Sequence, residues 1–126
     1  MKGEKEMKNR NIENDKMQRQ TLKEWLDEGA EKFGKSFKGW RFKCPACGKV
    51  TSVQEFIDAG GDANDAYREC IGRVNGKGVS GMKVKKGVVP EYGCDWAAYG
   101  LFGTLGRGRI VLTPGGEEAH VFDFAD

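Results

Sequence analysis

Apolar positions recur at helical spacing over the dozen residues that follow Thr21. Thr21 and Glu24 form an S/T-x-x-E capping box, in which each side chain can bond the backbone N–H of the other residue. Gly34 is placed to end the helix, because glycine adopts the backbone conformations that terminate helices. We therefore expect a helix between the capping box and Gly34. Its apolar stripe consists of Leu22, Trp25, Leu26, Ala30 and Phe33.

The spacing then changes from helical to alternating. Two aromatic and two basic residues alternate at positions 40–43, which is typical of a strand with one buried face. The four residues are Trp40, Arg41, Phe42 and Lys43. We expect this strand to span Phe37–Lys43 and a short extended piece to follow at Lys49–Thr51.

Two further helices are predicted next. Ser52 and Glu55 form a second capping box, and a short apolar face follows it before Gly60. Asp62 is placed to cap a third helix that Gly72 would end. The apolar face of this third helix would carry Ala63, Ala66, Tyr67, Cys70 and Ile71.

The second half of the chain is rich in glycine and changes character. Arg73–Gly87 has no clear pattern, and we expect a weak hairpin or a mobile binding segment there. Gly93–Phe102 is compatible with a short buried helix or with a strand. Arg109–Thr113 and Ala119–Phe124 are β-type and flank a Pro-Gly-Gly-Glu turn at residues 114–117, which predicts a terminal hairpin. The pattern as a whole indicates a small α+β domain with short helices in its first half and a C-terminal β-hairpin.

Composition narrows the class of protein. A chain of 126 residues with 38% hydrophobic residues is long enough for one domain. Its 19 glycines predict many turns. No apolar run approaches the roughly 20 residues that a membrane span needs, and residues 1–19 contain no apolar stretch typical of a signal peptide. We therefore expect a cytoplasmic protein.

Charge divides the chain in two. Residues 1–20 hold six basic and four acidic residues and no hydrophobic period, which indicates a charged flexible tail or a frayed helix. The acidic residues among the basic ones argue against a nucleic-acid-binding arm. A single α+β domain is expected to occupy residues 21–126.

The four cysteines form the most specific motif. Cys44 and Cys47 belong to a C-P-x-C-G turn, and the spacing over the chain is C-x2-C-x22-C-x23-C. A two-residue spacing lets one tight turn aim both thiolates at one ion, and a structural zinc site takes four such ligands. Cys70 and Cys94 would complete the set from separate elements. We therefore predict one zinc ion that holds three segments together.

Other roles for these residues stay open at this point. Cys70 could be an ordinary buried thiol, and His120 could replace one cysteine as a ligand. A redox C-x-x-C is disfavoured because three residues separate the motif from the next helix cap. A catalytic zinc site with Asp95 or His120 beside three cysteines is the remaining alternative. The H-x-E part of the deaminase signature does not precede the first cysteine, and the glycine-rich G-T-L-G-R-G stretch at residues 103–108 is interpreted as a turn, so we expect no enzyme.

Basic residues cluster along the segments that carry the cysteines. If zinc joins these segments, the basic residues could share one face that contacts nucleic-acid phosphates or a protein partner. The candidates are Lys38, Arg41, Lys43, Lys49, Arg68, Arg73, Lys77, Lys83, Lys85 and Lys86. An ordinary solvated surface is the competing interpretation. The large aromatic residues are expected in the core: Trp25, Trp40, Phe42, Trp96, Tyr99 and Phe102.

Four local strings together resemble a family of small uncharacterised bacteriophage and prophage proteins. They are W-R-F-x-C-P-x-C-G at 40–48, A-Y-R-E-C-I-G-R at 66–73, C-D-W-A-A-Y-G-L-F at 94–102 and H-V-F-x-F at 120–124. The resemblance spans Thr21–Ala125 and includes all four cysteines. It implies an accessory protein made in an infected or lysogenic bacterium, with no known activity attached.

Two functions are consistent with these observations. The first is a non-catalytic protein that binds and inhibits or modulates a bacterial macromolecule, as an anti-CRISPR-like inhibitor of a nucleic-acid-processing defence complex would. The second is a zinc-dependent nucleic-acid-binding or regulatory module. A zinc hydrolase or deaminase is a minor third alternative.

Overall fold

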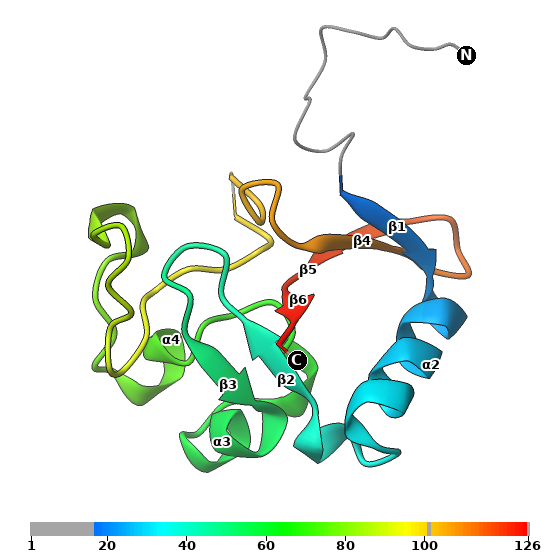
Figure 1. Ribbon diagram of the computed structural model, residues 1–126, viewed down its shortest axis with the longest axis horizontal. Coiled ribbons are helices and arrows are strands. Elements are labelled where there is room, and N and C mark those ends of the chain that lie inside the picture. The colour runs from blue at the N-terminus through cyan, green and yellow to red at the C-terminus, as the bar shows by residue number, and fades with distance from the viewer. Residues whose placement is uncertain (1–16, 101, 126) are drawn as a thin grey trace, which may run out of the picture.

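A three-stranded sheet pairs one strand from the N-terminal part of the chain with two strands from the C-terminal part. The computed structural model describes residues 17–100 and 102–125 (Figure 1). Strand β1 (Gln18–Thr21) pairs in parallel with β4 (Arg109–Leu112), and β4 pairs antiparallel with β5 (Glu118–Val121). The predicted C-terminal hairpin is therefore confirmed.

Strand β1 corrects the expected boundary of the N-terminal tail. Met17 and Gln20 are buried, and Gln18–Thr21 forms the edge of the sheet, so the expectation of a tail through residue 20 is wrong for residues 17–20. The expected tail over residues 1–16 lies outside the described part of the chain. The strand has the polar sequence Q-R-Q-T and no alternating pattern. It forms because β4 supplies its hydrogen-bonding partner, which no local pattern reveals.

Both predicted capping boxes are present. In α2 (Leu22–Phe33) the backbone N–H of Glu24 donates to the Thr21 hydroxyl at 3.1 Å, and Glu24 accepts from the Thr21 N–H at 2.8 Å. In α3 (Val53–Asp58) Ser52 and Glu55 make the same exchange at 3.0 and 2.8 Å. The boxes satisfy N–H groups at each helix start that have no partner inside the helix.

A second three-stranded sheet has the order β3-β2-β6. Strand β2 (Arg41–Lys43) is shorter than expected, because Phe37–Gly39 forms a 3-10 turn (η2) before it. It pairs antiparallel with β3 (Val50–Ser52) and with β6 (Asp123–Phe124). Phe122 separates β5 from β6, so the C-terminal segment passes from the first sheet to the second (Figure 1).

The predicted third helix is wrong. Asp62 caps only one 3-10 turn, η3 (Ala63–Asp65). The next residues instead bond distant backbone: the Tyr67 carbonyl accepts from the Phe122 N–H at 2.7 Å and the Cys70 N–H donates to the Trp96 carbonyl at 3.0 Å. These tertiary bonds use backbone groups that a helix would pair internally.

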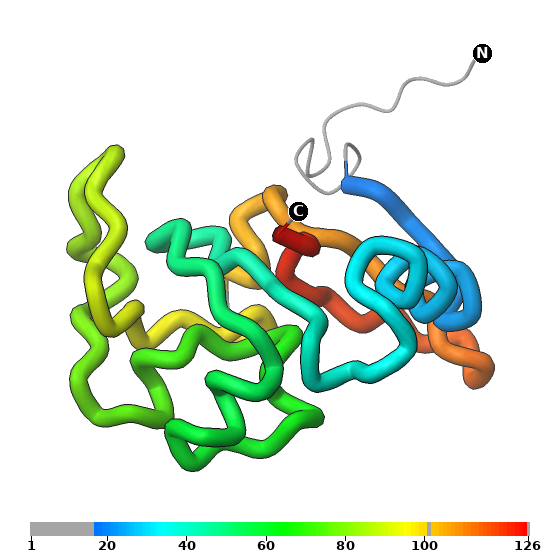
Figure 2. The backbone as a smooth tube through the Cα atoms, turned by 60° about the horizontal axis from the view of Figure 1, so that its bottom comes forward, coloured from blue at the N-terminus to red at the C-terminus, as the bar shows by residue number. Residues whose placement is uncertain are grey.

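Residues 72–100 form turns and isolated bridges. The helix α4 (Gly72–Asn75) begins where the third helix was expected to end, and η4 (Gly81–Lys83) follows. Val79 makes a parallel bridge with Cys94, so the segment is not a hairpin, which was one of the two structures expected for it. Residues 93–100 and 102 form neither a helix nor a regular strand. The yellow-green segment around η4 projects at the end of the molecule opposite α2 (Figure 2).

Aromatic rings fill the core between the second sheet and α2. Trp25 stacks with Phe42 and Phe124, at centroid distances of 6.1 and 5.8 Å, and meets the edge of Trp40. Trp96 is also buried, as expected. Two of the predicted core residues are instead exposed: Tyr99 is 55% and Phe102 is 57% accessible. Within the described residues no helix is long and apolar enough to cross a bilayer.

Candidate metal centre

The first two cysteines lie on the tight turn that joins β2 to β3. The Cys44 N–H donates to the Lys49 carbonyl at 3.0 Å, and the Gly48 N–H donates to the Cys44 carbonyl at 2.9 Å. Gly48 has a φ of +81°, a conformation that costs glycine little. The turn brings the Lys49 N–H within 3.4 Å of the Cys47 sulfur. The C-P-x-C-G motif thus forms the expected tight turn, and we call residues 44–48 the knuckle.

The other two cysteines come from separate loops that pack closely. The Cys94 N–H donates to the Cys70 sulfur at 3.3 Å. Gly93 has a φ of +80°, and a Cβ there would lie 2.9 Å from the same sulfur. A Cβ on Gly72 would lie 2.4 Å from the Cys94 carbonyl oxygen. Glycine is therefore needed on both loops for the two thiols to approach the knuckle.

The four sulfurs form one compact cluster. All lie within 4.8 Å of one another. The Cys44–Cys94 and Cys47–Cys70 sulfur pairs are each 3.7 Å apart. Zinc–sulfur bonds of about 2.3 Å in a tetrahedron require sulfur–sulfur edges of about 3.8 Å. All four thiols are free and buried, and their separations are far above the roughly 2.05 Å of a disulfide. The cluster therefore has the geometry of a four-cysteine metal site.

The four thiols differ in how readily they ionise. The pKa of Cys70 is lowered, first by its hydrogen bond with Cys44 and then by those with the other thiols. The pKa of Cys44 is raised, first by its hydrogen bond with Cys47, and burial acts in the same direction. The pKa of Cys47 is lowered as well, whereas that of Cys94 is raised. The buried cluster therefore resists the ionisation of all four thiols, because like charges repel in a medium of low dielectric constant. A divalent cation would supply the charge that lets all four ionise.

The alternative ligands are not part of the cluster. Among the described residues, the group contains no histidine or carboxylate. His120 lies on β5 and lines a different hollow with Tyr67, Tyr99 and Phe102. The Asp95 carboxylate accepts a hydrogen bond from the Gly81 N–H at 2.8 Å, which ties down η4.

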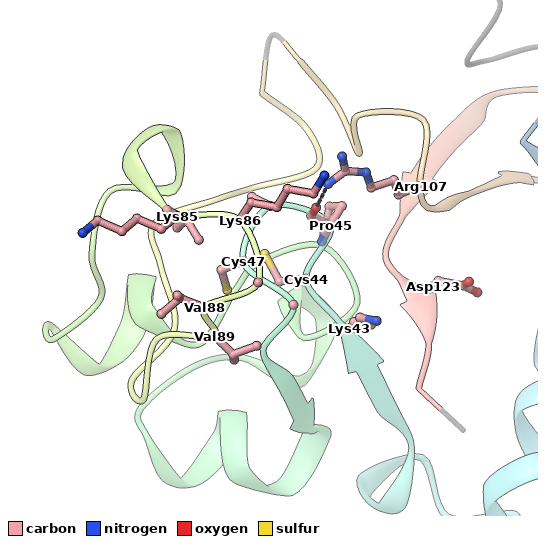
Figure 3. Close-up of a pocket in the computed structure, with 14 residues that line it drawn as sticks. Lys43, Cys44, Pro45, Cys47, Lys85, Lys86, Val88, Val89, Arg107 and Asp123 are labelled. Atoms are coloured by element: carbon pink, nitrogen blue, oxygen red, sulfur yellow. Dashed lines mark hydrogen bonds between the residues drawn. The ribbon is translucent and has the colours of Figure 1, made fainter.

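A hollow of about 750 Å³ lies over the knuckle. We call it the knuckle groove. Arg107 reaches it from the loop before β4 and donates to the Pro45 carbonyl at 2.8 Å (Figure 3). Its charged lining residues are Lys43, Lys85, Lys86, Arg107 and Asp123, and its aliphatic ones are Pro45, Ala46, Val84, Val88 and Val89.

Comparison with known proteins places the chain in a family. Residues 21–125 match the sequence model of the VVA0879-like family. The chain belongs to this family. The family is uncharacterised, and the match covers all four cysteines. No curated protein and no solved structure matched the chain.

The VVA0879-like protein brings together only some of the predicted basic residues. Lys43, Lys85 and Lys86 line the knuckle groove. Arg68 instead pairs with Asp65, and Arg73 pairs with Glu69. The remaining predicted residues line other surfaces: Lys38 on η2, Arg41 over the Phe33 ring, Lys49 in a small hollow beside β2, Lys77 over the Tyr92 ring and Lys83 on η4.

Sequence reasoning missed Arg107. It lies in the glycine-rich stretch that was interpreted as a turn, more than 50 residues from the knuckle that it contacts. The turn interpretation is right, because residues 102–108 form turns and bends. Nothing in the local pattern shows that this turn folds back onto Pro45.

Proposed function

We propose that this VVA0879-like protein is a non-catalytic binding protein whose fold is held by one structural zinc ion. The observation that carries the proposal is the buried set of four cysteines within 4.8 Å of one another. Zinc suits four thiolates in a tetrahedron, and such a site is closed. A closed site leaves no position for an activated water or a substrate, which argues against a zinc hydrolase or deaminase.

Metal analysis of the purified protein tests this proposal. We expect about one zinc ion per chain and loss of the folded structure after chelation, since the binding energy of a structural metal contributes directly to folding. A protein that stays metal-free and stably folded would contradict the proposal. A spectroscopic count of fewer than four sulfur ligands would favour the hydrolytic alternative.

The partner that we propose is a bacterial macromolecule in the cytoplasm of a phage-infected or lysogenic host. The support is the resemblance of the cysteine-bearing strings to phage and prophage proteins, together with an accessible groove beside the knuckle. An anti-defence inhibitor would bind a nucleic-acid-processing complex and block it. Adding the purified protein to such a complex and measuring nuclease activity tests this role, and undiminished activity at saturating protein argues against it.

A nucleic-acid-binding module is the second candidate. It is favoured by the four basic side chains that line the knuckle groove. Titration with duplex and single-stranded DNA and RNA at about 50 and 200 mM salt distinguishes the two candidates, because phosphate contacts weaken steeply as salt rises. Tight, salt-dependent binding by the isolated chain supports the second candidate and argues against the first.

A further inference from the structure

The knuckle groove carries uncompensated positive charge. Among the described residues, no carboxylate lies within 4 Å of the charged nitrogens of Lys43, Lys85, Lys86 or Arg107. Of the lining residues that the structure describes, one is acidic, Asp123, and its carboxylate already accepts from Arg109 at 2.8 Å. In Figure 3 the Lys86 side chain extends toward the Arg107 guanidinium along the upper rim. Cations gathered in one hollow without carboxylates paired to them favour an anionic ligand.

An aliphatic surface lies beside these charges. Val88 and Val89 are 56% and 55% exposed, although both line the groove. Figure 3 places them on the side away from Arg107, so one ligand could touch both the apolar and the charged sides. Exposed aliphatic side chains in a hollow favour a ligand that buries apolar side chains of its own.

A peptide fits this combination better than a nucleic acid does. Single-stranded nucleic acids bind through aromatic platforms on which the bases stack, and the groove lining contains no aromatic residue. The exposed rings of Tyr99 and Phe102 line a different hollow. The N-terminal segment of this chain is not a suitable ligand for the groove. Residues 1–16 hold five basic and four acidic residues, so they lack the net negative charge that would complement the groove.

We infer that the knuckle groove binds an acidic peptide segment of a partner protein, with apolar side chains against Val88 and Val89 and carboxylates against Lys43, Lys86 and Arg107. This inference rests on the proposed function and specifies the chemistry of the partner. The knuckle contributes to the proposed peptide site, because Cys44, Cys47 and Gly48 line the groove.

The test is fluorescence anisotropy with the zinc-loaded full chain and labelled synthetic peptides. The probe is a 12-residue peptide of Glu-Leu-Asp repeats. Its two controls are Gln-Leu-Asn repeats, which lack charge, and Glu-Ser-Asp repeats, which lack apolar side chains. We expect each control to bind at least about tenfold more weakly, because both kinds of contact contribute.

Matched variants locate the binding. We expect the double variants Lys86→Gln/Arg107→Gln and Val88→Ser/Val89→Ser each to raise the Kd of the Glu-Leu-Asp peptide about tenfold. The control Lys23→Gln/Lys35→Gln removes two positive charges elsewhere, from α2 and from an exposed position just beyond its C-cap, and is expected to bind normally.

Several results would overturn the inference. They are no binding of the Glu-Leu-Asp peptide at millimolar concentration, equal binding of the uncharged peptide, or unchanged affinity in the groove variants. Tighter binding of a 12-nucleotide DNA that depends on Lys86 and Arg107 would overturn it in favour of a nucleic-acid site. The proposed function is tested separately, by the zinc content and the sulfur-ligand count of the same samples.

Discussion

Cys94 is the most enclosed of the four thiols, with no exposed surface. Its backbone N–H donates to the Cys70 sulfur, so the two loops that carry these residues depend on each other. Each contributes one sulfur to the cluster, whereas the knuckle contributes two. Losing any one ligand breaks the closed set in the same way.

We therefore predict that Cys70→Ser and Cys94→Ser are nearly as damaging as Cys44→Ser. Each variant should lose most of its zinc and unfold well below the temperature of the native protein, because metal binding and folding are coupled. Zinc content by mass spectrometry and thermal unfolding provide the measurement. Asn64→Ser, at an exposed position on η3, is the control and should keep the metal. If Cys70→Ser or Cys94→Ser keeps it too, the ligand set is wrong.

Gly93 is crowded and has a positive φ, whereas Gly115 has neither feature. Gly93→Ala should lower the free energy of unfolding by about 1–3 kcal/mol for a non-glycine residue at positive φ, and the contact of its Cβ with the Cys70 sulfur adds to this cost. Gly115→Ala should change it little, since the nearest atom to its Cβ would be 3.9 Å away. Urea unfolding of both variants measures the difference. Equal effects would contradict the close packing around Cys70.

Glu28 connects α2 to the C-terminal hairpin. Its pKa is lowered, first because Arg109 donates a hydrogen bond to its carboxylate, at 2.5 Å. A carboxyl whose pKa is lower in the folded state stabilises the fold above its unfolded pKa of about 4.3 and loses that contribution as the pH falls through the folded pKa.

Glu28→Gln should therefore lower the free energy of unfolding by about 1–2 kcal/mol at pH 7. The difference from the native protein should shrink as the pH falls below about 4, when the native carboxyl becomes protonated as well. Chemical unfolding between pH 7 and pH 3 measures it. Glu31→Gln, at an exposed position on the same helix, is the control and should show little effect at either pH. A pH-independent cost at position 28 would argue against an ionic role.

Helix α3 is short, and its cap carries much of its local stability. Val53 and Phe56 are 0% and 1% exposed, so the cap also orients core residues. Ser52→Ala should cost about 1 kcal/mol of stability, because the Glu55 N–H loses its acceptor. Gln54→Ala, on the exposed face of the same helix, is the control and should be near neutral. Similar effects of the two variants in urea unfolding would show that the capping box is unimportant.

The elements with local signals were predictable, and those with remote partners were not. Residues 52–55 specify the start of α3 by themselves, because both capping partners lie within four residues. Residues 63–71 carry an equally good helical pattern, but the Tyr67 carbonyl and the Cys70 N–H bond residues 122 and 96 instead. Strand β1 fails for the opposite reason: its local pattern is weak and its partner, β4, lies about 90 residues away.

The four cysteines all lie in one part of the molecule. The knuckle and the loops at Cys70 and Cys94 have only short regular elements around them. The sheet β1-β4-β5 contains no cysteine and is held by its own ladder.

We predict that chelation loosens the cysteine-bearing part first. Hydrogen exchange followed by mass spectrometry should show the largest loss of protection over residues 44–50 and 67–98, with a later loss in β4 and β5. The physical reason is that local stability follows local packing and cross-links. Zinc re-addition is the control and should restore protection. A simultaneous loss over the whole described chain would mean that the two parts unfold as one unit.

The cysteines of the candidate metal site were predictable from the sequence. Residue type and spacing were enough to name Cys44, Cys47, Cys70 and Cys94, because four thiols without remainder match the coordination of one ion. They were also enough for the two caps and the terminal hairpin, whose partners are close in sequence.

The composition of the groove was decided by the tertiary structure alone. Arg107 lies beside the knuckle, whereas Arg68 and Arg73 are neutralised by Asp65 and Glu69. A list of basic residues cannot separate these cases, because charge becomes available for binding only where folding leaves it without a counter-charge. The same dependence on remote packing exposes Tyr99 and Phe102, which by composition belonged in the core.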